Sequence, residues 1–477
     1  MTLNPKYAGS GPLFSLSRLQ QYAVSLWVMA TALTLGVTIG TGKWLLGVVA
    51  FVAVLALLYP VQVALGAFVL LLPFDSIAAI GQADRGRTLT WFAGAGATLV
   101  LLGTGLITRR LKAPSSGALW WMLFIAWSAI TSLWALNPEA SWQRLSTAVA
   151  LLGLYFASSC FRFTRSELQT IVGFLILGGL GAAIWTVYLF FHGEYADPIA
   201  MRASLMMGSR ETNPNDLGMS LLLPISLSFG YFLSSRRWLA KAVLLGVMVA
   251  TTLGLLVTMS RGAFVALLAT LSVYLYRRKA RWQVLVPLLV VAILLSFMPS
   301  AFFDRFQQAT ESGGSGRLDI WQVGATALGH YGLVGAGLEN FPFAYAQYAG
   351  QASHFRGFYR DPHNVYLCVA VEGGFLGFLL FVGAIRSQLR AVFKVKEHFA
   401  SSNVLLAAEA GAWGMLTFGL FGNNLWQKSF WFSWMLLAAA VSTASETRET
   451  VPEEAQGSPI RARTSRVRTH SVVNPAL

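Results

Sequence analysis

Long apolar runs alternate with short polar loops through most of the chain, from Tyr22 to Ala444. Most runs contain about 15 to 22 residues, enough for a helix to cross the ~30 Å hydrocarbon core of a bilayer. The pattern predicts a bundle of about 12 to 14 membrane helices. The count is a range because several runs are short and the two runs on either side of Pro60 are the least distinct. The predicted spans lie near residues 22–40, 44–58, 60–74, 88–107, 118–135, 145–161, 168–191, 217–234, 239–259, 263–276, 283–303, 363–385, 403–421 and 430–444.

The composition agrees with this pattern. Of the 477 residues, 55% are hydrophobic and 12% are charged, and the mean hydropathy of +0.59 is far above that of a soluble domain. Strands of an outer-membrane barrel would alternate apolar and polar residues, whereas these runs are apolar on every side. We therefore expect an all-α polytopic membrane protein without a second, soluble domain.

The distribution of positive charge predicts the orientation. A net charge of +15 would suggest nucleic-acid binding in a soluble protein, but here most Lys and Arg residues occupy alternate short loops. These loops and both termini are expected in the cytoplasm, where they meet anionic membrane lipids and not nucleic acid. The first run, Tyr22 to Gly40, is interpreted as a retained anchor because further spans follow it. The basic loops carry Arg109, Arg110, Lys112, Arg162, Arg165, Arg236, Arg237, Lys241, Arg277, Arg278, Lys279, Arg281, Arg386, Arg390, Lys394 and Lys396.

The longest polar connection divides the chain. N-terminal membrane helices are expected over residues 1–303, a cap over 304–362 and C-terminal membrane helices over 363–445. The tail, 446–477, mixes Glu and Arg without apolar periodicity and is expected to be disordered. A connection as long as 304–362 inside a membrane protein is usually functional, so the cap is expected to cover the active face.

A histidine stands where the cap gives way to an apolar helix. Asp361 is a suitable N-cap and Pro362 suits the first helical position, which would put His363 in the first turn. A helix N-terminus disfavours the imidazolium and attracts anions, so a neutral base beside a phosphate is expected. Gly374 and Gly377 would return to the same face and allow close packing of another helix. The alternative is an interfacial histidine that is polar and nothing more.

Arginines occur on the face where positive-inside alternation should deplete them. Arg261 lies in a tight turn between two apolar runs on that face. Guanidinium groups bind phosphate oxygens through two parallel hydrogen bonds, so converging arginines would suit a diphosphate. Each one alone could instead be a structural residue or a snorkelling anchor. The others on this face are Arg202, Arg210 and Arg317, with Arg305, Arg356 and Arg360 in or near the predicted cap.

The remaining polar residues suggest structural roles. Asn213 to Asp216 is interpreted first as a turn with an N-cap. Glu372 and Glu409 lie inside apolar runs and need partners there. Cys160 and Cys368 have neither disulfide nor metal-ligand spacing and are expected to be small apolar fillers. No motif with metal-ligand spacing occurs on the active face, so we expect neither a metal nor another cofactor.

The histidine motif resembles a known signature. His363-Asn364, nine residues, Gly374, two residues and Gly377 is similar to the pattern of bacterial O-antigen ligases and the wider O-antigen ligase/polymerase superfamily. Three segments of this chain together resemble the sequence block that members of the superfamily share. They are Gly316–Trp321, Gly335–Phe341 and Asp361–Gly377. Its weaker upstream motifs resemble Asn213–Asp216 and Ser260–Gly262.

The resemblance implies a GT-C-like fold and a metal-independent, inverting glycosyl transferase. It would move a glycan from undecaprenyl diphosphate to a lipid A–core hydroxyl at the periplasmic face of the bacterial inner membrane. His363 would take the acceptor's proton, and Arg261 and Arg317 would hold the diphosphate, with Arg210 as a third candidate. Residues implied to support the site are Asn364, Asn215, Asp216, Gly374 and Gly377.

The superfamily also contains O-antigen polymerases and protein O-oligosaccharyltransferases, which differ in the acceptor. The complete histidine signature and the short region after the last span favour the ligase. A different class of function is transport of an anionic lipid-linked sugar, with arginines binding the substrate and His363 relaying protons. A transporter would carry charges along a pathway open to both sides, whereas the arginines singled out here lie on one face.

Overall fold

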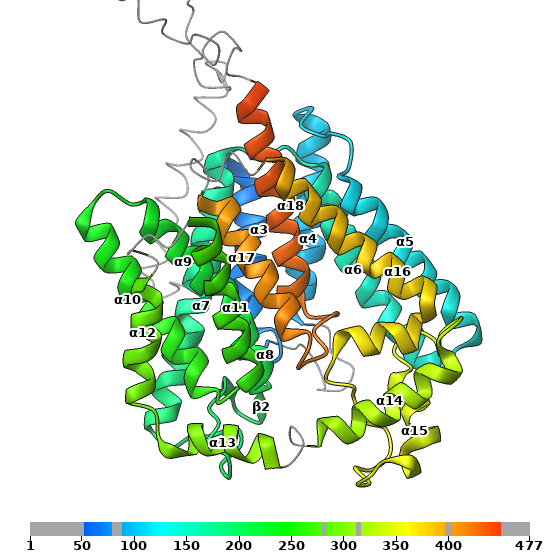
Figure 1. Cartoon of the computed structure of the whole chain (residues 1–477). Helices are drawn as coiled ribbons and strands as arrows, with labels where there is room; N and C mark the ends of the chain where they lie inside the picture. The colour runs from blue at the N-terminus through cyan, green and yellow to red at the C-terminus, as the bar shows by residue number, and fades with distance from the viewer. Residues whose placement is uncertain are drawn as a thin grey trace, which may run out of the picture.

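The computed structural model describes residues 52–78, 88–278, 283, 285–311, 316–395 and 403–449. Long helices run side by side and shorter helices gather at one end (Figure 1). The all-α prediction is confirmed. The elements are α3 (Pro60–Leu71), η1 (Leu72–Phe74), α4 (Leu89–Ile107), α5 (Ser116–Thr131), η2 (Ser132–Trp134), α6 (Pro138–Cys160), α7 (Arg165–Phe191), β1 (Met206–Met207), β2 (Arg210–Glu211), α8 (Pro214–Ser220), α9 (Leu222–Ser234), α10 (Trp238–Val257), α11 (Arg261–Arg278), α12 (Leu285–Ser296), α13 (Ser300–Glu311), α14 (Arg317–Tyr331), α15 (Phe341–Tyr348), η4 (Ala349–Gln351), α16 (Val365–Lys394), α17 (Asn403–Phe418) and α18 (Lys428–Glu449).

Six helical segments of the described part are long and apolar enough to cross a membrane, or seven if one bent pair counts as a span. Shorter apolar helices, Pro60–Phe74 and Val404–Phe418, accompany them. The chain is therefore a multi-pass membrane protein. The total of about 12 to 14 helices stays a prediction, because residues 22–40 and most of 44–58 lie outside the described part.

The segment predicted as one span at 283–303 is broken. α12 and α13 are bent by 100° relative to each other. Pro299 lacks an amide hydrogen and disfavours a helical residue before it, so α12 ends at Ser296. α13 then runs nearly crosswise to α12 at the lower edge of Figure 1 and crosses the predicted boundary between residues 303 and 304.

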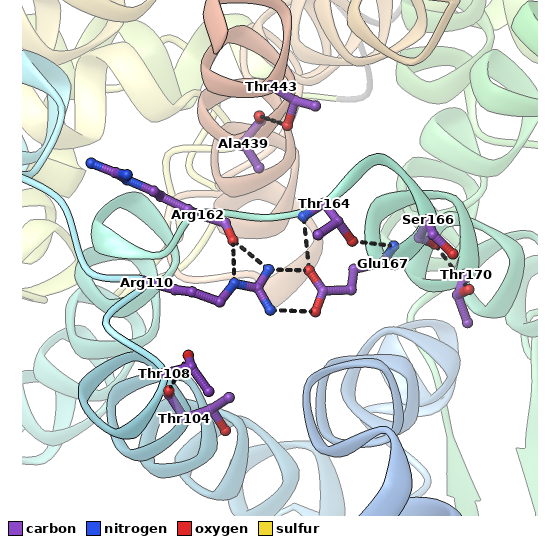
Figure 2. A network of polar contacts seen from close by, with 10 residues as sticks. All are labelled: Thr104, Thr108, Arg110, Arg162, Thr164, Ser166, Glu167, Thr170, Ala439 and Thr443. Atoms are coloured by element: carbon purple, nitrogen blue, oxygen red, sulfur yellow. Dashed lines mark hydrogen bonds and ion pairs between the residues drawn. The ribbon is translucent and has the colours of Figure 1, made fainter. Parts of the chain in front are cut away.

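At the upper end of Figure 1, loops rich in basic residues meet, and we call this the basic end. Arg110 joins two of these loops there, as Figure 2 shows. Its Nη1 donates to Glu167 Oε1 at 2.8 Å, and its Nε donates to the carbonyl of Arg162 at 3.1 Å. Glu167 also closes a capping box with Thr164 at the start of α7. One guanidinium thus fixes the end of α4 against the start of α7.

A break in α16 attaches the short helices to the bundle. Gly374 has φ 63° and ψ −165°, which interrupts the helix and frees backbone groups on both sides. In an unbroken helix the amide of Phe375 would bond to Val371, but it donates to Gly332. Every freed group named here has a partner, so the break acts as a docking site. The bonds are Ala336 N to Val371 O (2.9 Å), Gly337 N to Glu372 O (3.1 Å), Trp127 Nε1 to Gly373 O (2.7 Å) and Phe375 N to Gly332 O (2.7 Å).

The turn that enters this docking site requires glycine. Gly335 has φ +86°, a left-handed conformation that other L-residues adopt at a cost. A Cβ atom there would lie 2.2 Å from the carbonyl oxygen of Glu372. The glycine therefore permits the turn after α14 to touch the backbone of α16 directly.

Gly374 and Gly377 do not act as the sequence predicted. They were expected on one continuous helical face below His363. Because Gly374 breaks the helix, that face does not continue to the histidine. Gly377 instead faces α5, where a Cβ atom would lie 3.1 Å from Trp127 Cδ1. The prediction of close helix packing thus holds for Gly377 alone.

The carboxylates inside apolar helices have the partners that they were expected to need. Glu409 of α17 accepts a hydrogen bond from Arg277 Nε of α11 at 3.1 Å. Glu372 accepts from the backbone amide of Phe341 at 3.1 Å, which ties the start of α15 to α16. Cys368 is buried among apolar residues of the interface between α16 and the short helices.

Candidate active site

The chain turns sharply before α16, and this corrects the predicted helix start. Asn364 is the N-cap: its Oδ1 accepts from the amides of Tyr366 and Leu367, both at 3.0 Å. The prediction of Asp361 as N-cap is wrong, because His363 adopts φ +46° and cannot continue a helix from Pro362. His363 thus lies just outside the helix.

Tertiary contacts hold this turn on both sides. Trp321 Nε1 of α14 donates to the carbonyl of Pro362 at 2.8 Å. On the other side, the amide of Val365 donates to the carbonyl of Gly419, beyond the end of α17, at 2.8 Å. A left-handed histidine costs about 1 kcal/mol or more, so these contacts also stabilise an unfavourable backbone. They give the imidazole a fixed place.

His363 faces a cavity of about 400 Å³ at the end of the bundle opposite the basic end. Six arginines line it, contributed by α11, α13, α14 and the segments before α8 and α16. Asn215, Gly262 and Ile320 complete the wall. The structure therefore brings Arg261 and Arg317 together with His363, although 102 residues separate Arg261 from His363 along the chain. The arginines are Arg202, Arg261, Arg305, Arg317, Arg356 and Arg360.

Little negative charge balances these arginines within the described residues. Arg356 forms an ion pair with Asp319, with Nε 2.7 Å from Oδ2. No described carboxylate lies within ion-pair distance of Arg202, Arg305 or Arg317. In addition, Arg305 Nε is buried and has no hydrogen-bond partner in the described part of the chain. An anion entering the cavity would satisfy these groups.

The positive charges in the cavity repel one another and lower the pKa values of the arginines. Burial, and then the charge of Arg305, lower the pKa of Arg202 to about 10. Burial, followed by Arg261 and Arg305, also lowers the pKa of Arg317. Each shift means that the cavity disfavours its own positive charge. A bound polyanion would relieve that repulsion, so this is an anion site by electrostatics as well as by shape.

The imidazole itself is predisposed to be neutral. Burial, and then the positive charge of Arg317, lower the pKa of His363 below its ordinary value. Arg360 acts in the same direction, while Asp361 opposes it. The sequence predicted a neutral ring because of the helix terminus, but burial and the neighbouring guanidinium are the main causes. A neutral imidazole can accept a proton near pH 7.

The Asn-Pro-Asn-Asp segment supports one wall of the cavity. Asn213 caps α8 by accepting from the amide of Asn215 at 2.9 Å, which confirms the predicted turn and N-cap. Asn215 Oδ1 accepts from Arg202 Nη2 at 2.7 Å and from Ser260 Oγ at 2.9 Å. Asp216 accepts from Gln427 Nε2 at 3.1 Å and does not line the cavity.

The tight turn before α11 delivers a second arginine. Arg261 is the first residue of α11, and its Nη1 donates to the carbonyl of Arg305 at 2.7 Å. Ser260 Oγ accepts from the amide of Ala263 at 3.3 Å, as an N-cap does. The turn thus links α11 to α13 and sets both arginines at the cavity.

Arg210 is the sequence-predicted phosphate ligand that the structure places elsewhere. It lies on β2, paired with Met207, and is not among the residues that line the cavity. Arg202 and Arg305 line it instead. Their types and positions on the correct face were visible in the sequence, but no motif distinguished them from Arg210. The bend at Pro299, which carries Arg305 under the bundle, could have provided a signal.

Within the described residues, no group of three or more His, Cys, Asp or Glu side chains could hold a metal ion. The side chains that line the cavity offer an imidazole and several guanidinium groups.

The chain is similar in sequence to a family of O-antigen ligases and to proteins that carry the name polysaccharide ligase. Residues 246–382 match a family described as O-antigen ligase, and this segment contains Arg261, Arg305, Arg317 and His363. A protein of Rickettsia prowazekii, provisionally named a polysaccharide ligase, is 24% identical over 328 residues, covering 66% of this chain and 76% of that protein. Similarly named proteins of Rickettsia typhi and Rickettsia felis are 23% and 25% identical over 328 and 335 residues. Those alignments cover 66% of this chain and 76% and 78% of the two relatives.

Proposed function

We propose that the chain is a member of the O-antigen ligase superfamily, as its sequence similarities support, and that it transfers an O-antigen glycan from undecaprenyl diphosphate to lipid A–core. The reaction takes place at the periplasmic face of the bacterial inner membrane. It needs no metal and inverts the configuration of the transferred sugar. The observation that carries this proposal is the cavity in which an imidazole of lowered pKa faces an excess of guanidinium groups.

His363 acts as the general base. The acceptor hydroxyl attacks the anomeric carbon of the donor sugar, and its proton passes to the neutral imidazole. A new glycosidic C–O bond forms while the bond from the anomeric carbon to the phosphate oxygen breaks. The proton then leaves His363 for water, which restores the base. The lowered pKa of His363 supports this role because it keeps the ring unprotonated before each turnover.

The arginines hold the donor and stabilise the leaving group. Negative charge builds up on the diphosphate as its bond to the sugar breaks, so fixed positive charge lowers the barrier without a protein acid. Arg261 and Arg317 remain the principal candidates, since both line the cavity with His363. Arg305 and Arg202 join them in place of Arg210. The unsatisfied Arg305 Nε supports an anionic ligand on that side.

The orientation proposed for the site follows from the basic end. Positive-inside alternation assigns the loops of Arg110 and Arg162 to the cytoplasm. The cavity lies at the opposite end of the bundle, which is then periplasmic, and both termini are cytoplasmic. Lipid-linked glycan donors are amphipathic, so a cavity at a membrane boundary suits them.

The proposal is tested by transfer with purified protein. A defined undecaprenyl-diphosphate glycan is supplied with lipid A–core, a second lipid-linked repeat unit, or a hydroxyl-bearing peptide as acceptor. We expect glycosylated lipid A–core and one undecaprenyl diphosphate released per transfer, unchanged by a chelator. A product on the repeat unit alone would indicate a polymerase, and one on the peptide alone a protein oligosaccharyltransferase. Movement of the donor across a liposome membrane without a covalent product would indicate a transporter.

A further inference from the structure

A second cavity, far from the arginine cluster, lies between α5 and α16 near the basic end. It is an open groove of about 940 Å³. The two helices pack side by side along the right-hand edge of Figure 1. Ser116 and Ser387 hydrogen-bond at 2.9 Å and join the helices at the basic end of the groove.

One part of the groove is apolar. Leu376, Leu379 and Val382 of α16 line it and remain 42%, 45% and 38% exposed. Trp120 of α5 forms the facing wall and packs against the backbone at Gly383, where a Cβ atom would lie 2.4 Å from its ring. The apolar surface is therefore built by two helices and is concave.

The other part of the groove is basic. Arg386, Arg390 and Lys394 line it at intervals of four residues, so they share one face of α16 over about 12 Å. All three are exposed, and no described carboxylate lies within ion-pair distance of them.

Other cations of the basic end differ in this respect. Arg110 is paired with Glu167, and Arg277 with Glu409. An arginine or lysine beside an apolar groove, with no described carboxylate as its partner, is suited to an anionic ligand with an apolar body. These two ion pairs show that the fold supplies carboxylate partners to some cations of the basic end.

The dimensions match one leaflet of a bilayer. The distance along α16 from Leu376 to Arg386 is about 15 Å, which is half of the ~30 Å hydrocarbon core. An acyl chain lying against Leu376 to Val382 would therefore place its phosphate beside the basic residues.

We propose that the groove between α5 and α16 binds one anionic glycerophospholipid, with its acyl chain along Leu379 and Val382 and its phosphate at Arg386, Arg390 and Lys394. This site is separate from the proposed transfer reaction, and its test does not depend on that activity. The bound lipid fills the groove between the two helices.

The test counts phospholipids bound to the full-length protein. The purified protein is incubated in detergent with phosphatidylglycerol or with zwitterionic phosphatidylethanolamine, and native mass spectrometry measures the bound fraction. The wild-type protein should retain phosphatidylglycerol at least about tenfold more tightly than phosphatidylethanolamine. The triple variant Arg386→Gln/Arg390→Gln/Lys394→Gln should lose this preference.

A matched control variant distinguishes lipid binding in the groove from non-specific attraction of the anionic lipid to positive charge. Arg109→Gln/Arg236→Gln/Arg237→Gln removes the same charge from exposed positions at the basic end that do not line the groove. It should bind like the wild-type protein. Leu379→Trp keeps every charge but fills the groove, and it should also lower the retention of phosphatidylglycerol.

Three results would overturn the proposal. Equal binding of phosphatidylglycerol by the two triple variants would leave only non-specific charge attraction. Equal retention of phosphatidylethanolamine and phosphatidylglycerol by the wild-type protein would remove the preference for an anionic lipid. Finally, a Leu379→Cys variant that cross-links to a second copy in the membrane would make the groove a dimer interface.

Discussion

At the scale of single residues, two charged residues that precede His363 in the chain, Arg360 and Asp361, change its pKa in opposite directions. Arg360 lowers that pKa and Asp361 raises it, while burial and Arg317 set the larger part of the shift. A base is active when unprotonated, so transfer should fall as the pH drops through the pKa of His363 in the folded protein, which is lower than that of an ordinary histidine.

The two neighbours provide a paired prediction. Arg360→Gln removes a positive charge, which should raise the pKa of His363 and move the acid limb of kcat/KM to higher pH. Asp361→Asn removes a negative charge and should move the same limb to lower pH. The measurement is the pH profile of each purified variant, read at the half-maximal point. Shifts in the same direction, or none in either variant, would contradict His363 as the titrating base.

The residues of the candidate site were partly predictable. The histidine spacing and the arginines on the unexpected face pointed to His363, Arg261 and Arg317, and these three line one cavity. Arg210, the third arginine implied by the resemblance, pairs with Met207 at β2 and does not line the cavity. Arg305 lines it instead, because the bend before α13 brings it there. The predicted N-cap of α16 was wrong because Asp361 and Asn364 are both residues that cap helices well. The contact from Trp321 to Pro362 helps to select Asn364.

At the scale of elements, the break in α16 connects the short helices to the bundle. Apolar periodicity predicted one helix near residues 363–385, whereas α16 continues to Lys394 and is broken at Gly374. The break depends on amides from the turn after α14, which are 35 residues away from their acceptors. Sequence patterns that consider one segment at a time cannot reveal such a pairing. The same holds for the crosswise α13, although Pro299 marks its start.

Gly335→Ala tests this docking contact. The substitution forces an L-residue to φ +86° and brings a Cβ atom to 2.2 Å from the Glu372 carbonyl. We expect a loss of more than about 2 kcal/mol in stability, seen as a lower temperature of thermal unfolding in detergent. Gly329→Ala is the control, since nothing lies within 4 Å of its Cβ position inside α14. It should be neutral or stabilising by about 0.5–1 kcal/mol, and equal melting of the two variants would refute the contact.

At the scale of the whole molecule, α13 and α14, which contribute arginines to the cavity, lie at the end of the bundle opposite the basic end (Figure 1). The fold class and six of the predicted spans followed from hydropathy, because a bilayer constrains helices by length and composition alone. The proposed orientation rests on charge alternation.

Cysteine labelling tests that orientation with little background, since Cys160 and Cys368 are both buried. Ile199 is fully exposed in the connection on the cavity side, and Arg237 is exposed at the basic end. An impermeant maleimide added from the periplasm should label Ile199→Cys in intact inner membranes. It should reach Arg237→Cys only after those membranes are opened. The reverse pattern would invert the proposed topology.

The central claim is that His363 removes the proton from the acceptor during transfer. It is tested most directly by the rate of glycan transfer to lipid A–core by His363→Ala, compared with His330→Ala, which changes an exposed histidine of α14 outside the cavity. The account predicts that kcat of His363→Ala falls about 10²- to 10⁴-fold while donor binding persists, and that His330→Ala transfers at the wild-type rate. Turnover by folded His363→Ala within about threefold of the wild-type rate would contradict it.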